Sequence, residues 1–276
     1  KMTNLNFINS PFFDYGAINQ INNILKRHNI NRPLICTDPG IIKTDLLDIL
    51  RSNISNEFSP FIFNQTPANP TEEAVEIAVS TYKNEDCDGV IGFGGGSSLD
   101  LAKAVCLMVT HPGSLKDYSP TEGGIEKIHT TAPLIAIPTT SGTGSEVSSG
   151  AVIVMNDGRK LVLISKELIP LAAICDPELT LGLPTAMSAG GGMDALTHCI
   201  EAILSPAIDP PAEGVGLDGI EKIVREGNLI KVIKDSGDRE ARWNMMMAAT
   251  EGAMAFTKGL GAVHSMSHAL GSKQDL

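Results

Sequence analysis

The stretch Asp88-Gly-Val-Ile-Gly-Phe93, followed by Gly94-Gly95-Gly96-Ser97-Ser98, decides the fold class of this sequence. Its first part is short and apolar, which predicts a buried strand, and residues 99–110 predict a helix. Glycines between a strand and a helix let backbone N–H groups approach a phosphate closely, at the positive end of the helix dipole. The alternative is a tight turn without a ligand, in which Ser97 and Asp100 have the spacing of a capping box.

Strand and helix patterns alternate on both sides of this stretch. Such alternation is typical of parallel strands joined by helices in an α/β sheet. After a strand or hairpin within residues 1–16, the predicted strands are residues 33–38, 58–63, 88–93, 133–137, 151–155 and 172–176, and the predicted helices are residues 17–28, 44–50, 71–83 and 99–110.

The pattern changes after Leu183, beyond which no strand is predicted. Apolar residues recur there with helical spacing, in residues 187–204, 217–224, 239–256 and 263–270. A chain of 276 residues is long enough for two domains. We therefore predict an α/β dinucleotide-binding domain over residues 1–182 and an all-helical metal-binding domain over residues 183–276.

Composition narrows the classes of partner. The chain has 21 basic and 32 acidic residues, a net charge of -11, and no cluster of Lys or Arg, which argues against a nucleic-acid or anionic-membrane partner. No stretch is apolar for long enough to span a bilayer. The five cysteines are scattered and odd in number, which is typical of reduced, buried thiols in a cytoplasmic protein.

Two pairs of potential metal ligands lie on predicted helices. Asp194 and His198 are four residues apart, as are His264 and His268, so each pair shares one helix face. Imidazoles combined with a carboxylate suit Zn²⁺ or Fe²⁺ better than Mg²⁺ or Ca²⁺. A single histidine on an apolar helix is more often a core residue, but two such pairs together favour a metal site.

Polar residues also follow the buried strands. Asp38 ends one strand, where an acid can bind the hydroxyls of an adenosine ribose and would repel a 2′-phosphate; this favours NAD over NADP. Its alternative is a cap at the Asp-Pro-Gly turn. The loop Pro138–Glu146 is rich in hydroxyls and suits a polar ligand, or else it is an ordinary hydroxyl-rich turn. Lys160 can neutralise a phosphate or be merely solvated.

These motifs together resemble the iron-containing (group III) alcohol dehydrogenases. The resemblance rests on four segments in the right order and spacing: Gly94–Ser97, Pro138–Glu146, Gly192–His198 and Val263–His268. It implies a Rossmann-like N-terminal domain, an all-helical C-terminal domain, and NAD with a divalent metal between them. It also implies reversible oxidation of a primary or secondary alcohol to its aldehyde or ketone, and a homodimer or larger assembly.

Roles follow from the resemblance position by position. The implied metal ligands are Asp194, His198 and His264, and His268 matches a histidine near the nicotinamide and substrate, which we assign as catalytic. The implied cofactor-binding residues are Asp38, Asn69, Gly95, Gly96, Ser97, Thr139, Thr140, Lys160 and Leu179.

One departure from the family pattern concerns the end of the sequence. The family has a fourth ligand, a histidine in a Pro-His-Gly motif, about where this sequence stops at Leu276, and it continues as further helices. We therefore expect this sequence to be part of a longer chain. Two rival functions remain: a metal- and NAD-dependent lyase or cyclase of the dehydroquinate-synthase type, and a catalytically dead nucleotide-binding protein.

Overall fold

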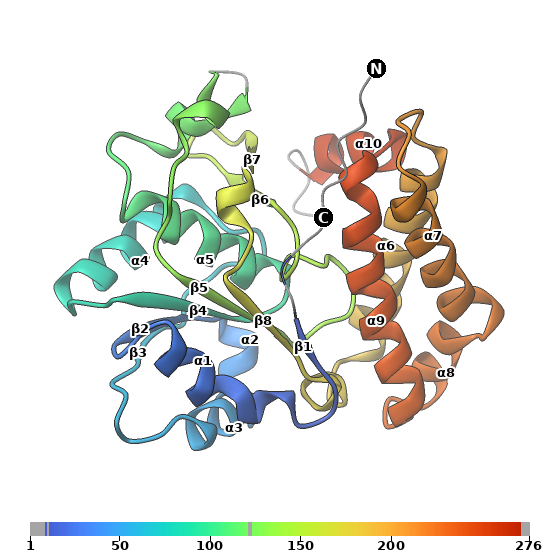
Figure 1. The fold of residues 1–276 in the computed structure, drawn as a ribbon, viewed down its shortest axis with the longest axis horizontal. Helices are drawn as coiled ribbons and strands as arrows, with labels where there is room; N and C mark the ends of the chain where they lie inside the picture. The colour runs from blue at the N-terminus through green and yellow to red at the C-terminus, as the bar shows by residue number, and fades with distance from the viewer. Residues whose placement is uncertain (1–8, 10, 121–122, 272–276) are drawn as a thin grey trace.

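A computed structural model describes residue 9, residues 11–120 and residues 123–271. A sheet with helices on both faces forms one side of the molecule, and a group of helices forms the other (Figure 1). This arrangement confirms the predicted combination of an α/β part and a helical part. The boundary at Leu183 stays a prediction. Among the described residues no helix is long and apolar enough to cross a membrane.

The main sheet has six strands in the order β1-β8-β5-β4-β2-β3, and every neighbouring pair is parallel. Parallel strands need crossover connections, which the helices between them provide. The strands are β1 (Phe12–Phe13), β2 (Pro33–Cys36), β3 (Phe61–Phe63), β4 (Gly89–Gly94), β5 (Leu134–Pro138) and β8 (Ala172–Cys175).

Two predicted strands at the edges of the sheet need correction. The strand predicted from residue 58 begins only at Phe61, because Phe58 turns into the core beneath the sheet instead of joining the ladder. In the N-terminal prediction, Phe12 and Phe13 pair with β8, while Phe7 and Ile8 lie outside the described residues.

Alternate residues of the strands point to opposite faces of the sheet, and both faces are buried. Leu34, Val90 and Leu134 pack against α4 (Glu72–Asn84) and α5 (Gly96–Met108). Ile35, Ile91 and Ile135 pack on the other face. That face is covered by α1 (Ile21–Arg27) and α3 (Leu46–Asn53), with the short α2 (Pro39–Ile42) beside them. Burial on both faces explains why these strands are apolar throughout.

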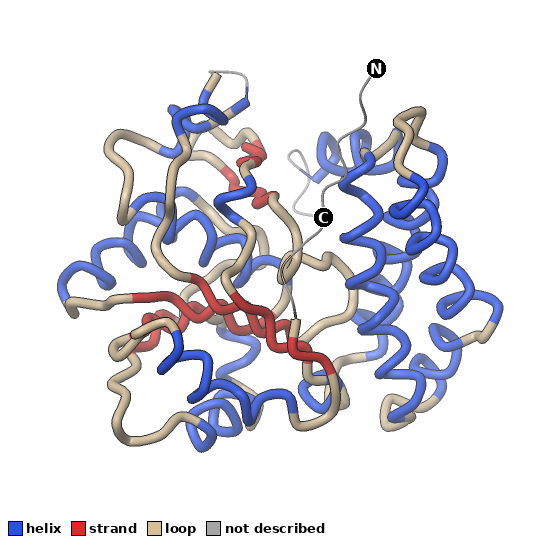
Figure 2. Tube along the Cα trace, viewed as in Figure 1, coloured by secondary structure: helices blue, strands red, loops and turns tan. Residues whose placement is uncertain are grey.

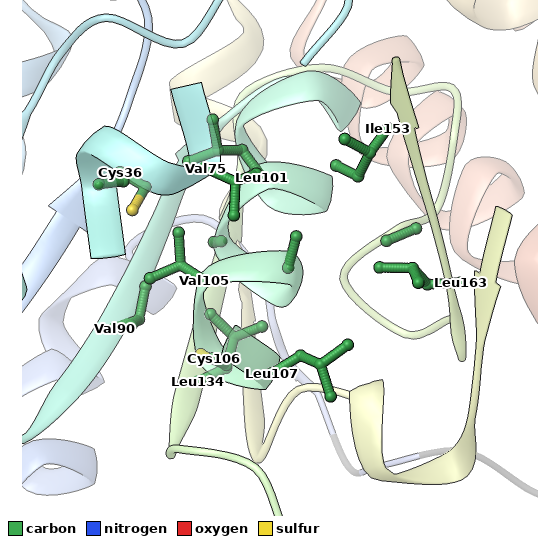
Figure 3. Close-up of a cluster of buried hydrophobic side chains, with 14 of the residues drawn as sticks. Cys36, Val75, Val90, Leu101, Val105, Cys106, Leu107, Leu134, Ile153 and Leu163 are labelled. Atoms are coloured by element: carbon green, nitrogen blue, oxygen red, sulfur yellow. The ribbon is translucent and has the colours of Figure 1, made fainter. Parts of the chain in front are cut away.

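Helix α5 lies between the sheet and a separate antiparallel hairpin. The hairpin consists of β6 (Gly150–Val154) and β7 (Lys160–Ile164). Ile153 and Leu163 of the hairpin face Leu107 and its neighbours on α5, while Val90 and Leu134 of the sheet lie on the other side of the helix (Figure 3). Helix α5, which begins at the glycine turn, is therefore held from two sides.

The second half of the chain is nearly all helix (Figure 2). Its helices are α6 (Thr185–Leu204), α7 (Pro210–Ile220), α8 (Asn228–Lys234), α9 (Arg239–Ala255) and α10 (Ala262–Gly271). Helix α7 was predicted over residues 217–224, which is wrong. It begins at Pro210, where the Asp209 side chain accepts a hydrogen bond from the Ala212 N–H and caps the helix, and a π-helical turn over residues 221–225 follows it.

The loop after β5 joins the two halves of the molecule. A Cβ atom on Gly142 would lie 2.9 Å from the Cα atom of Gly191 in α6, so both positions need glycine for the loop and the helix to touch. The Thr250 hydroxyl of α9 donates to the buried Glu146 carboxylate over 3.3 Å. These contacts bring α6 to the edge of the sheet where the strands end.

Candidate active site

The glycine turn after β4 opens toward the loop after β5. The Thr139 N–H donates to the Gly94 carbonyl over 2.9 Å, which ties the two segments together. A Cβ atom on Gly96 would lie 2.6 Å from Cγ2 of Thr143, so a larger residue there would fill the space between them. The first N–H groups of an α-helix have no acceptor inside the helix, so Gly96 and Ser97 offer donors to an anion here.

The capping box predicted for this turn is absent. Gly95 occupies the N-cap position, and no side chain caps the helix. The Ser97 hydroxyl donates instead to the Ala68 carbonyl, and the Asp100 carboxylate accepts from the Ser145 hydroxyl and the Val152 N–H. The capping-box explanation of the turn is therefore wrong, because the helix start relies on backbone alone. The phosphate-binding turn and the turn without a ligand both stay predictions.

Asp38 lies at the same edge of the sheet, just after β2. One of its carboxylate oxygens accepts from the N–H groups of Gly40 and Ile41 and caps α2; the other accepts from the Ser98 hydroxyl over 3.2 Å. The capping interpretation is thus correct. The carboxylate is nevertheless partly exposed beside the glycine turn, so a ribose can still reach it.

The structure brings most of the other predicted cofactor residues to this edge. Thr140 lies against the glycine turn, 3.4 Å from the position of a Cβ atom on Gly95. The Lys160 ammonium donates to the Asn69 side-chain oxygen over 3.1 Å, so this lysine is not simply solvated. Leu179 differs from the rest, because the residue is only 1% exposed, its side chain packs in the core, and its N–H donates to the Asp176 carbonyl.

The three predicted metal ligands converge. Asp194 and His198 of α6 and His264 of α10 each offer one ligand atom, and these atoms all lie within 4.8 Å of one another. The Asp194 Oδ1 atom is 3.7 Å from His198 Nε2 and 3.4 Å from His264 Nε2. One carboxylate oxygen and two imidazole nitrogens form a donor set that fits Fe²⁺ or Zn²⁺.

The surroundings of these residues suit metal binding as well. Burial lowers the pKa of His198 to about 4, although the Asp194 carboxylate opposes the shift, so its ring is neutral at physiological pH. Burial alone would raise the pKa of Asp194, but the contact with His264 and the other nearby histidines outweigh it and lower that pKa. Metal ligands have to be deprotonated, and both residues meet that requirement. His264 differs, because its contacts with Asp194 and Glu201 raise its pKa, so a metal there has to displace a proton.

A cavity of about 500 Å³ connects this trio with the loop that faces the glycine turn. Asp194, His198 and His264 line it together with Thr143 of that loop. His268 also lines the cavity; its ring is half-buried, 5.9 Å from the His264 ring between centroids, and burial lowers its pKa. The cavity therefore places the predicted catalytic histidine beside the predicted metal ligands.

Sequence reasoning missed the roles of Lys103 and Asp100, which support this cavity. Lys103 is fully buried in α5 and donates to the carbonyl oxygens of Ser148 and Gly150, each over 2.8 Å; burial lowers its pKa to about 8. The Asp100 carboxylate holds the same segment by accepting from the Ser145 hydroxyl and the Val152 N–H. The sequence does contain a signal for these roles: Asp100 and Lys103 are the two charged residues of α5, and the other residues of that helix are apolar or small.

Comparison with known proteins identifies relatives over the whole chain. Residues 9–177 match the iron-containing alcohol dehydrogenase family, and residues 188–276 match the C-terminal part of the same family. The 4-hydroxybutyrate dehydrogenase of Cupriavidus necator is 48% identical over 259 residues, which are 94% of this chain and 67% of that protein.

Solved structures agree with these sequence matches. A 1,3-propanediol oxidoreductase superimposes with a TM-score of 0.92 at 31% identity, covering 100% of this chain and 72% of that one. The sulfoacetaldehyde reductase of Bifidobacterium kashiwanohense, solved in complex with NAD⁺, has a TM-score of 0.88 at 25% identity and covers 100% and 73%. The chain thus spans about two thirds to three quarters of the length of these relatives.

Proposed function

This chain belongs to the iron-containing alcohol dehydrogenase family, and from that premise we propose that it interconverts an alcohol and its carbonyl compound with NAD and a divalent metal. The observation that carries the proposal is the single cavity that joins the cluster Asp194–His198–His264 to the loop facing the glycine turn. A metal at the cluster and a dinucleotide on the turn would then meet across that cavity. Neither rival function is favoured by the relatives, which are dehydrogenases, oxidoreductases and reductases.

Each group supplies one part of the chemistry. A divalent cation polarises a substrate oxygen, and NAD accepts or delivers the hydride. Asp194, His198 and His264 would hold the cation, and the backbone of Gly95, Gly96 and Ser97 would hold the pyrophosphate. The cofactor site would be completed by Thr139, Thr140, Asn69, Lys160 and Asp38, and Leu179 would support it from the core.

His268 is the residue we assign to proton transfer. It lines the cavity next to His264 and is partly exposed, so its ring can reach both a substrate and solvent. An imidazole whose pKa lies below its usual range is neutral at physiological pH, so it can accept the proton that an alcohol loses on oxidation.

The lining of the cavity bears on the substrate. Its described part contains no Lys or Arg. The charge of Lys160 nevertheless reaches the lining residue His268, where it helps to lower the pKa of the ring, and it can attract a carboxylate. Hydroxyl-bearing residues such as Ser148, Ser149 and Thr257 line it instead. We therefore propose a short alcohol with a polar group at its far end, and the similarity to a 4-hydroxybutyrate dehydrogenase makes 4-hydroxybutyrate the first compound to test.

The direct test is a steady-state assay of the full-length protein loaded with Fe²⁺ or Zn²⁺. With NAD⁺, we expect NADH to form from 4-hydroxybutyrate with a higher kcat/KM than from 1,3-propanediol or ethanol. Turnover of 1,3-propanediol or ethanol alone would refute the substrate assignment but keep the reaction. If no alcohol were oxidised and no aldehyde reduced by the metal-loaded protein, the proposed function would be wrong.

Location and assembly complete the proposal. Five free, buried cysteines suit a reducing compartment, so we propose a cytoplasmic enzyme. We also propose a homodimer or larger assembly and a domain boundary near Leu183. Light scattering coupled to gel filtration tests the assembly, and limited proteolysis near Leu183 tests the boundary.

A further inference from the structure

Glu201 joins the two helices that carry the metal-ligand cluster. It lies on α6 three residues after His198 and seven after Asp194, so all three share one helix face. Its carboxylate is buried, with 6% of the residue exposed. One oxygen accepts from the Gly261 N–H over 2.9 Å and lies 2.6 Å from His264 Nδ1, and the other accepts from the Val263 N–H over 2.6 Å.

These contacts determine which nitrogen of His264 carries the proton. Both oxygens of Glu201 face N–H donors, so the group acts only as an acceptor, and the Nδ1 atom of His264 has to donate to it. In the neutral ring the lone pair is then on Nε2, the atom that lies 3.4 Å from Asp194 Oδ1. The ring consequently offers a metal the nitrogen that faces the other ligands.

We propose that Glu201 is a positioning residue that fixes the tautomer and orientation of His264 and thereby sets the affinity of the site for its metal. The inference rests on the metal site of the proposed function and adds a residue to it. A carboxylate behind a ligating imidazole also raises its basicity, and loss of such a partner typically lowers metal affinity about 10- to 100-fold.

A purely structural role is the competing explanation. Glu201 also accepts from two backbone N–H groups at the start of α10, so it anchors that helix whether or not a metal binds. Gly261 permits the close approach, because a Cβ atom there would lie 2.9 Å from Glu201 Oε1. The two roles differ in their effect on His264, since an anchor alone does not require a particular tautomer.

The experiment compares the full-length wild type with Glu201→Gln. The amide keeps the shape of the carboxylate but turns an NH₂ group toward one of the three N–H donors, so part of the His264 population shifts to the Nε2–H tautomer. We expect the dissociation constant for Zn²⁺ or Co²⁺, measured by competition with a chelator, to rise about 10- to 100-fold. In the metal-free protein, ¹⁵N NMR of the imidazole nitrogens should report the tautomer shift directly.

Two further variants make the result decisive. Gly261→Ala adds a methyl group that would push the Glu201 carboxylate away from the start of α10. It should therefore weaken metal binding, as Glu201→Gln does. Glu221→Gln, which alters an exposed ion pair with Arg225, is the matched control and should bind metal like the wild type. Thermal unfolding of each metal-free variant measures how much of the effect is anchoring.

The outcomes separate this inference from the proposed function. If Glu201→Gln lowered the unfolding temperature but left both the metal affinity and the tautomer of His264 unchanged, Glu201 would be an anchor only and the inference would be wrong. If the wild type itself bound no divalent metal, the proposed function would fail at its metal site. The tautomer measurement would still show whether Glu201 controls His264.

Discussion

The glycine turn of the sheet half and the metal-ligand cluster of the helical half are built in different ways. The turn offers backbone N–H groups, held by a sheet whose two faces are both buried and by a helix packed from two sides. The cluster offers side chains from α6 and α10, and the second of these helices is exposed along much of its length. Most of the large exposed apolar side chains among the described residues also lie on the helical half.

This difference has a consequence for how each region responds to mutation. A site made of backbone depends on glycines and on the core beneath them, so single side-chain changes at its rim should have modest effects. A site made of three side chains depends on each one. We therefore expect mutations to separate dinucleotide binding from metal binding.

The largest effect is expected for Asp194→Ala, which removes one of the three ligands. Loss of metal-based stabilisation of several kcal/mol corresponds to a fall in kcat/KM of about a thousandfold. The NADH dissociation constant, measured by fluorescence, should stay within about twofold of the wild type, as for Asp48→Ala, a control on the exposed face of α3. Unchanged turnover would contradict the metal site, and loss of NADH binding would contradict the separation of the two regions.

The second effect concerns stability. Ile91 is fully buried at the centre of the sheet, so Ile91→Ala should lower the free energy of unfolding by about 2–5 kcal/mol. Leu229 of α8 is 8% exposed in the smaller helical core, and Leu229→Ala should cost less. Chemical denaturation of both variants measures the difference. Equal costs would mean that the two cores are equally well packed.

The third effect is on cofactor binding. At position 96 even a Cβ atom would lie only 2.6 Å from Thr143, so the branched side chain of Gly96→Val would fill the space between the turn and the loop. We expect the NADH dissociation constant to rise about tenfold or more, a loss of roughly 1.4 kcal/mol, with metal affinity unchanged. Gly214→Ala in α7 is the control, because a Cβ atom there has no neighbour within 4 Å. Wild-type NADH affinity in Gly96→Val would remove the turn from the cofactor site.

The smallest effect is a pH dependence of stability in the helical half. Burial, together with a hydrogen bond to Asp218, raises the pKa of Glu251 to about 8, although Lys222 lies 3.2 Å from the carboxylate and opposes the shift. The native state then keeps a proton that the unfolded chain releases, so the free energy of unfolding falls as the pH rises between about 4.5 and 8.

Glu251→Gln should remove this dependence and be more stable than the wild type near pH 8, where the wild type has to keep or lose the proton at a cost. Urea denaturation at several pH values measures it, with the exposed Glu221→Gln as control. Parallel stability curves for wild type and Glu251→Gln would show that Glu251 ionises normally.

Much of the fold was predictable because its signals are local. Buried parallel strands such as β2, β4 and β5 are short apolar runs, and each was predicted at nearly its observed position. Helix α7 was misplaced because its sequence contains two prolines and three glycines, which lower helix propensity. Two of those glycines, Gly216 and Gly219, lie against Cys199 of α6, so tertiary packing explains them.

The sequence by itself determined the fold class, because apolar periodicity is a property of the chain. Its motifs also carried the resemblance to the iron-containing alcohol dehydrogenases, which implied the family and its chemistry. Only the tertiary structure decided which polar groups share a contact. Asp100 and Ser145 are 45 residues apart, and Glu201 and His264 are 63 apart, so no local pattern relates them. The glycine turn could be read along the chain since its donors are consecutive, whereas the support behind His264 exists only once α6 and α10 have packed together.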